Sequence, residues 1–204
     1  MKPYKEIYKE KSFLLHLGIT VIVLIAALSM FSKFLLFVEK RPGAVLDDPL
    51  FRLYPVMNFN VIIFILIYGS ILTALIALLF HPKVLLIALQ SYILLILLRT
   101  LAMYLTPLDP PAGTIDLQDP LVFVVGTGSI ITKDLFFSGH TSMLFLLFLT
   151  AQNKILKYVF LTSLIFVVAF ILLQKAHYTI DILTAPFFSY ASYKIVSHFH
   201  SIKN

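Results

Sequence analysis

Two histidines stand at the start of long apolar segments in the C-terminal half of the chain. His140 follows Ser138 and Gly139 in the stretch "KDLFFSGHTSMLFLLFL", and His177 lies in the stretch "AHYTIDIL". Asp181 follows His177 by four residues, so on a helix it lies one turn away on the same face. This spacing predicts a hydrogen bond that fixes the tautomer of His177 and leaves its other ring nitrogen free as a nucleophile or base.

Groups that suit an anion accompany the two histidines. The guanidinium of Arg99 offers paired donors that match a phosphate, and a helix that opens at Ser138 and Gly139 would add backbone N–H groups. His140 can protonate a leaving alkoxide. A nucleophilic His177, an acidic His140 and an anion-binding group together describe phosphoryl transfer through a phosphohistidine, and this chemistry requires neither a metal nor a cofactor.

Each of these residues also has a simpler interpretation. A histidine at a membrane interface is commonly just an interfacial polar residue, and the pair His177–Asp181 can serve helix packing alone. The guanidinium of Arg99 can reach the lipid headgroups without binding any substrate. The presence of all these groups at one membrane face favours a functional site over three unrelated features.

The composition of the chain is that of a membrane protein. Of its 204 residues, 60% are apolar and 13% are charged, whereas soluble domains have about 45–50% and about 25%. The absence of cysteine excludes disulfides, thiolate catalysis and Cys-based metal sites. A net charge of +6 is typical of membrane proteins with basic cytoplasmic loops, so nucleic acid is not an expected partner.

Six segments are long enough to cross a hydrocarbon core about 30 Å thick, which takes about 20 apolar residues. We expect an all-α fold, a polytopic bundle of six transmembrane helices that forms a single membrane domain over residues 1–204. The predicted spans are roughly 13–38, 60–80, 84–106, 135–151, 155–173 and 178–196. Pro186 predicts a kink in the last span, just below the His–Asp pair.

The distribution of basic residues predicts the orientation. The side that holds the termini would carry nine: Lys2, Lys5, Lys9, Lys11, Lys83, Lys154, Lys157, Lys194 and Lys203. The opposite side would carry five: Lys40, Arg41, Arg52, Lys133 and Lys175. The excess of Lys and Arg marks the cytoplasmic side, so both termini are expected there. His140, His177 and Arg99 would then lie together at the extracytoplasmic face.

Two stretches resemble the motifs of a known family. "DLFFSGHTS" (134–142) and "AHYTIDI" (176–182) resemble the two motifs of the sphingomyelin synthase family, a branch of the type-2 phosphatidic acid phosphatase superfamily. "RTLAMYLTPLDPP" (99–111) is similar to the segment that ends the third span in that family, and "LDDPLFRLYP" (46–55) resembles its first-loop motif. The resemblance runs from about residue 46 to the end of the sixth span.

The resemblance implies roles for individual residues. His177 would be the nucleophile, Asp181 its partner and His140 the general acid. The residues assigned to substrate or phosphate binding are Asp48, Arg99, Tyr104, Asp134, Ser138 and Gly139. The resemblance implies no metal ligand. Ile171 and Phe137 depart from the simple phosphatases of the superfamily, which have Arg and Pro at these positions. Ile171 is expected of the synthase branch, and the chain resembles a minimal member of that branch.

The leading hypothesis is a lipid phosphotransferase in a multi-pass membrane protein, in the inner membrane if the source is a bacterium. It would move a phosphocholine- or phosphoethanolamine-like headgroup from a glycerophospholipid to a lipid alcohol such as ceramide or diacylglycerol. The alternative is a lipid phosphatase or phospholipase C-like hydrolase that uses the same site. A transporter is disfavoured because the chain shows no inverted repeat. The sequence leaves the oligomeric state open.

Overall fold

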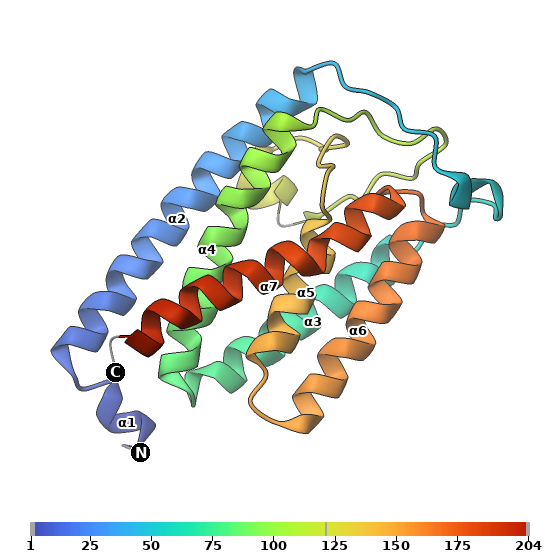
Figure 1. The fold of residues 1–204 in the computed structure, drawn as a ribbon. Helices are drawn as coiled ribbons and strands as arrows, with labels where there is room; N and C mark the ends of the chain where they lie inside the picture. Colours follow the sequence, from blue (N-terminus) through green and yellow to red (C-terminus); the bar gives the residue numbers. More distant parts are fainter. Residues whose placement is uncertain (1–2, 121, 203–204) are drawn as a thin grey trace.

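The computed structural model describes residues 3–120 and 122–202 of the chain. Helix accounts for 73% of the structure, and no strand occurs in these two ranges, so the expected all-α fold is confirmed. The elements in chain order are α1 (Tyr4–Ile7), α2 (Lys11–Lys40), η1 (Pro49–Arg52), α3 (Asn60–Leu79), α4 (Pro82–Leu105), η2 (Val122–Thr127), α5 (Gly139–Thr150), α6 (Lys154–Leu173) and α7 (Thr179–Ile202). Figure 1 shows their arrangement.

Four of the helices in the described part of the chain, α2, α3, α4 and α6, are long and apolar enough to cross a membrane. Each begins and ends within about two residues of a predicted span. The remaining two predicted spans correspond to α5 and α7. α7 has 24 residues but carries the charged side chains of Asp181 and Lys194. The predicted count of six spans therefore rests on these two helices and stays a prediction.

α5 is shorter than the range 135–151 that the sequence predicted. It begins only at Gly139 because Phe136 and Phe137 have positive φ angles of 66° and 41°, which a right-handed helix does not tolerate. Ser138 then caps the helix, since its side chain accepts a hydrogen bond from the N–H of Thr141. At about 1.5 Å per residue, its 12 residues extend about 18 Å.

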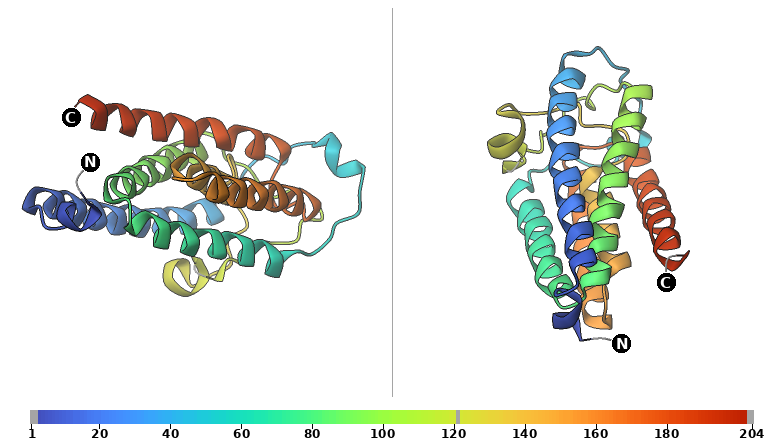
Figure 2. Two further views of the ribbon diagram at one scale, coloured as in Figure 1. Left: turned by 90° about the horizontal axis from the view of Figure 1, so that it is seen from below. Right: turned by 90° about the vertical axis from the view of Figure 1, so that its left-hand side faces the viewer.

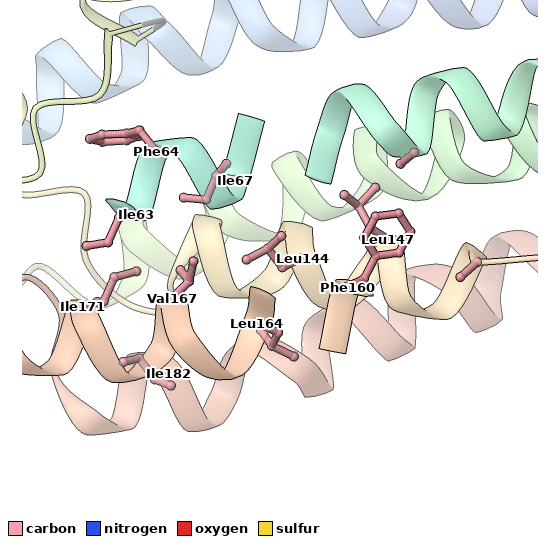
Figure 3. Packing of buried hydrophobic residues seen from close by; sticks show 12 residues of the cluster. Ile63, Phe64, Ile67, Leu144, Leu147, Phe160, Leu164, Val167, Ile171 and Ile182 are labelled. Carbon is pink, nitrogen blue, oxygen red and sulfur yellow. The ribbon is translucent and has the colours of Figure 1, made fainter. Parts of the chain in front are cut away.

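The short helix α5 lies in the interior of the bundle, in contact with α3, α4, α6 and α7 (Figures 1 and 2). α2 packs on α4 at one edge of the molecule, and α6 packs on α3 and α5 at the other. The main apolar core joins Ile63 and Ile67 of α3, Leu144 of α5 and Val167 of α6, all nearly inaccessible to solvent (Figure 3). Because α5 is surrounded by other helices, the histidine at its first turn lies inside the bundle.

Both long connections lie at one end of the bundle, and the two termini lie at the other (Figure 1). The connections, 41–59 and 106–138, are joined by two backbone hydrogen bonds of 3.0 Å, from Ala44 N to Pro107 O and from Asp109 N to Ala44 O. A side chain at Gly43 would overlap the backbone of Leu108, so glycine is required for this close approach. His140 and His177 lie at this same end, as the topology predicted.

Pro186 lies inside α7, and the helix continues on both sides of it to Ile202. The kink that the sequence indicated at this position stays a prediction. α7 also extends beyond residue 196, where the predicted span ended, because its last turns carry polar residues that a membrane-based prediction leaves out.

Candidate active site

A cavity of about 1090 Å³ opens at the end of the bundle where the two long connections meet. Its walls come from α2, α3, α4, the first turns of α5, the segment 114–134 and the turn before α7. Five of the nine predicted site residues line it: Arg99, Asp134, Gly139, His140 and His177. The structure thus brings together residues from α4, α5 and the turn before α7, which are far apart in the sequence.

His177 and Asp181 form the expected pair. Nδ1 of His177 lies 3.2 Å from Oδ2 of Asp181, and the two side chains are 3% and 0% exposed. The same carboxylate oxygen accepts a hydrogen bond from Tyr178 N at 3.2 Å. With Nδ1 donating to the carboxylate, the lone pair of His177 is on Nε2, which is the nitrogen available to a substrate in the cavity.

Asp48 fixes the start of the helix that carries this pair. Its Oδ2 accepts a hydrogen bond from Thr179 N, the first residue of α7, at 2.7 Å, and its Oδ1 accepts one from Leu50 N at 3.1 Å. The negative charge is also favourable at the positive end of the helix dipole. Asp48 does not line the cavity. The structure therefore places this predicted substrate-binding residue behind His177, as a cap on α7.

His140 also has a carboxylate partner, which the sequence did not reveal. Nε2 of His140 lies 3.3 Å from Oδ2 of Asp119. The other oxygen of Asp119 accepts hydrogen bonds from Tyr68 OH at 2.5 Å and from Val122 N at 3.1 Å. The two side chains of the pair are 15% and 17% exposed. His140 is thus held by a loop carboxylate that α3 and η2 keep in place.

The surroundings of Asp119 favour its charged form. Burial would raise the pKa of this carboxyl, but hydrogen bonds from His140 and Tyr68, together with the charge of His140, outweigh that effect and lower the pKa to about 2. Asp119 lies 21 residues before His140 in a loop without periodicity, so no spacing rule points to it. The only signal in the sequence was an acidic residue in the long loop that leads to the Ser-Gly-His motif.

Arg99 is a buried cation at the wall of the cavity, only 7% exposed. Its Nη2 donates to Oδ1 of Asp134 at 2.7 Å and to the backbone oxygen of Asp134 at 3.3 Å. The rings of Phe31 and Phe137 lie 5.7 Å and 5.9 Å from its guanidinium carbon. Nε is buried and finds no hydrogen-bond partner among the described residues. The guanidinium therefore retains donors for an anion in the cavity.

Gly139 explains why the motif before His140 contains glycine. A β-carbon at this position would coincide with Nη1 of Arg99, so only glycine lets the guanidinium lie against the first turn of α5. The positive charge and the free N–H groups of this turn then face the same space. The structure gives a steric reason for the Ser-Gly-His pattern that the sequence could only note.

Besides Asp48 and Asp181, two further predicted site residues, Ser138 and Tyr104, do not line the cavity. Ser138 is fully buried, caps α5 and donates its N–H to the backbone oxygen of Asp181 at 3.0 Å, so it links the helices of the two histidines. Tyr104 is 55% exposed, and the guanidinium of Arg41 lies over its ring at 5.3 Å. The contacts of Tyr104 thus point to a role on the outer surface of α4 rather than at the histidines.

Gln174 is a second important residue that the sequence did not single out. It is fully buried. Its Oε1 accepts a hydrogen bond from Phe59 N at 2.9 Å, and its Nε2 donates to Asn60 Oδ1 at 2.8 Å and to Ile115 O at 3.0 Å. One side chain thus joins the end of α6 to both long connections, and it fixes the turn that precedes His177.

No group of three or more His, Asp or Glu residues that could hold a metal ion occurs in the described part of the chain. Three carboxylates of the site are instead paired with one cationic or potentially cationic group each: Asp134 with Arg99, Asp119 with His140 and Asp181 with His177.

Comparison with known proteins finds a family match in the C-terminal third of the chain. Residues 133–199 match the family model described as PAP2 superfamily C-terminal. The matched segment contains His140, His177 and Asp181. The match supports membership of the PAP2 superfamily, whose members are typically phosphatases or phosphotransferases, and the apolar helices fit a multi-pass membrane protein. No curated protein matches the chain.

Proposed function

We propose that this PAP2-type membrane protein is a lipid phosphotransferase of the sphingomyelin synthase kind. It would transfer a phosphocholine- or phosphoethanolamine-like group from a glycerophospholipid to the hydroxyl of ceramide or diacylglycerol. The observation that carries the proposal is the single cavity that holds two carboxylate-oriented histidines and a buried arginine. These are the groups that a metal-free phosphoryl transfer needs.

In the first half of the reaction, Nε2 of His177 attacks the phosphorus of the donor. A P–N bond forms, the bond from phosphorus to the diacylglycerol oxygen breaks, and that oxygen takes a proton from His140. Asp181 accepts the hydrogen bond from Nδ1 and stabilises the charge that the imidazole acquires. The phospho-headgroup is left on His177, and diacylglycerol leaves.

In the second half, the acceptor hydroxyl gives its proton to His140 and attacks the phosphorus. The P–N bond breaks, and His177 returns to its neutral state. In the structure Nε2 of His140 is occupied by Asp119, so this nitrogen must exchange the carboxylate for a substrate oxygen in both halves. The guanidinium of Arg99 and the first N–H groups of α5 stabilise the charge on the phosphoryl oxygens.

The shape of the cavity supports a lipid substrate rather than a soluble phosphate ester. Away from the histidines, its walls are apolar and come from three helices: Ile25 and Leu28 of α2, Ile67 and Ile71 of α3, and Leu95 and Ile96 of α4. Such a surface favours the burial of an acyl chain. The headgroup would then lie among the charged residues and the chain along the helices.

Ile171 favours the synthase branch over the simple phosphatases. It lies six residues before His177, where the phosphatases have an arginine, and it is fully buried in the core between α3, α5 and α6. An arginine could not replace it there without an unpaired buried charge. We also propose that the cavity faces the extracytoplasmic side and that both termini are cytoplasmic, as the basic residues indicate.

The test incubates the purified protein with a labelled phospholipid, with and without ceramide or diacylglycerol, and identifies the products by mass. A transferase converts the acceptor into a new phospholipid. Free phospho-headgroup at an unchanged rate in saturating acceptor would instead indicate the hydrolase. His177→Ala should abolish turnover, whereas His81→Ala, an exposed histidine in the α3–α4 connection, serves as the matched control.

A second measurement tests the covalent intermediate through His140. Loss of the general acid should slow turnover of a natural donor by about 10²–10⁴. A nitrophenyl phosphodiester needs no acid for its leaving group, so His140→Ala should form the adduct on His177 and discharge it slowly. The adduct should then accumulate and be visible by intact mass at alkaline pH. A metal-dependent activity without any adduct would contradict the mechanism.

A further inference from the structure

Most of the charged side chains that line the cavity are already neutralised by a partner. Arg99 is paired with Asp134, and His140 with Asp119. Asp116 differs from them, because its carboxylate has neither a hydrogen bond nor an ion pair within the described parts of the chain. A charge at a largely apolar cavity is costly unless an opposite charge compensates it. A cationic ligand group would supply that charge.

The backbone holds Asp116 next to the proposed nucleophile. Ile115 N donates to Gln174 O at 3.1 Å, and Thr114 Oγ1 donates to Lys175 O at 2.8 Å. The backbone oxygen of Asp116 accepts a hydrogen bond from Asn60 Nδ2 at 3.1 Å. Residues 174 and 175 lead directly into His177, which lines the same cavity. The backbone that carries the carboxylate is therefore bound to the turn that leads into His177.

Two lysines at the same end of the molecule, Lys175 and Lys133, are engaged elsewhere. The ammonium of Lys175 lies 5.9 Å from the ring centres of both Phe51 and Tyr54. Lys133 is paired with Asp109 at 2.6 Å. Neither of them forms an ion pair with Asp116, although the backbone of Lys175 is bound to the same loop. Lys33 of α2 also lines the cavity, and among the described residues it is not paired with Asp116 either. The protein thus leaves this carboxylate without a cation at the place where a donor headgroup would lie.

Aromatic side chains add a second feature that suits a cation. Tyr68, Tyr92 and Phe123 line the cavity together with Asp116. The faces of aromatic rings attract ammonium groups, quaternary ones included. An anionic headgroup would gain nothing from these rings, and it would be repelled by the carboxylate.

From this arrangement we propose that Asp116 binds the ammonium group of the donor headgroup while the phosphate lies at His177. The inference rests on the proposed phosphotransfer and adds the residue that determines which phospholipid serves as the donor. Asp116 selects zwitterionic phospholipids, with an ammonium two carbons from the phosphate ester, over donors such as phosphatidylglycerol that lack a positive charge.

The experiment compares wild type, Asp116→Asn and Asp116→Lys on two donors with identical acyl chains, phosphatidylethanolamine and phosphatidylglycerol. Both are presented at a low mole fraction in an excess of uncharged detergent, so that the charge of the donor contributes little to the micelle surface. Asp47→Asn is the matched control, because Asp47 lies in the other outer loop, 75% exposed and paired with Arg52. Each variant is measured for kcat, KM and melting temperature.

We expect Asp116→Asn to lower kcat/KM for the zwitterionic donor by about 10–100-fold, mainly through KM, since a charge-assisted contact is lost. Turnover of phosphatidylglycerol should stay the same. Asp116→Lys should lower kcat/KM for the zwitterionic donor further and raise the turnover of phosphatidylglycerol. Asp47→Asn should leave both values unchanged.

Three outcomes would overturn the inference while leaving the phosphotransfer intact. The wild type could prefer phosphatidylglycerol. The Asp116→Asn enzyme could keep its activity and selectivity unchanged, or it could lose activity equally on both donors. The wild-type preference decides the question even if the variants do not fold. Absence of any turnover by folded wild-type protein, with either donor, would instead overturn the proposed function.

Discussion

The two histidines of the site are oriented in different ways. His177 takes its carboxylate from the same helix, one turn away, whereas His140 takes its carboxylate from a loop 21 residues earlier in the chain. The first pair is almost fully buried, and the second is about one-sixth exposed. The first depends on the geometry of one helix. The second depends on α3, η2 and the loop that precedes η2 being folded together.

This difference suits the two proposed roles. A nucleophile needs one fixed direction of attack, which a rigid pair on one helix provides. A general acid that serves both halves of a reaction must exchange partners, and the contact of Asp119 with His140, at 3.3 Å, joins two separate elements and is partly exposed. We therefore expect substitutions in the His177 pair to have larger effects than substitutions in the His140 pair.

The largest effect is expected for Asp181→Asn. The amide can donate a hydrogen bond to Nδ1 and so favour the tautomer that protonates Nε2, which removes the nucleophilic lone pair. A wrong histidine tautomer costs about 10⁴ in kcat in a comparable catalytic pair. Steady-state kinetics with a natural donor measure the loss, and circular dichroism checks the fold. An Asp181→Asn enzyme with nearly full activity would show that the contact between His177 and Asp181 serves only helix packing.

A smaller effect is expected for Asp119→Asn. His140 remains present but is less well oriented, so kcat should fall by about 10–10², below the 10²–10⁴ expected for loss of a general acid. The loss should nearly vanish in the first half-reaction with a nitrophenyl donor, whose leaving group needs no proton. Equal losses in Asp119→Asn and Asp181→Asn, independent of the donor, would show that the two pairs do not differ in role.

Substitution of Gly139 tests the anion-binding group that both histidines share. Gly139→Ala places a methyl group where Nη1 of Arg99 lies, so the guanidinium must move away from the phosphate. Loss of a charge-assisted hydrogen bond predicts about a 10–100-fold lower kcat/KM. Gly69→Ala is the control, because a β-carbon there meets no atom within 4 Å. Equal activities of the Gly139→Ala and Gly69→Ala enzymes would show that Arg99 takes no part in the reaction.

The smallest expected effect concerns stability at low pH. Because the pKa of Asp119 is about 2, below its ordinary value of 3.8, the charged carboxylate stabilises the fold above about pH 4 and less as the pH falls toward 2. Asp119→Asn should lack this dependence and melt a few degrees lower at neutral pH, about 2–4 °C per kcal/mol. Thermal melts in detergent from about pH 6 to about pH 2 measure it. Parallel curves for both proteins would contradict the assignment.

The sequence alone determined the features that depend on local spacing or composition. The apolar runs predicted where α2, α3, α4 and α6 lie, because a long apolar helix leaves a continuous pattern. The four-residue interval between His177 and Asp181 predicted their contact, because the helix repeat brings such positions together. The order of long and short connections predicted that His140 and His177 lie at the same end of the bundle.

Only the tertiary structure decided which residues from the loops join the site. Asp119 and Gln174 contact partners distant in sequence, and Asp116 lines the cavity from the same loop as Asp119. A loop has no repeat from which such placements can be predicted. Asp48 and Ser138 were expected at the substrate, but they cap α7 and α5. A carboxylate or hydroxyl can satisfy a helix end as well as a ligand, and the choice between them depends on how the chain packs around it.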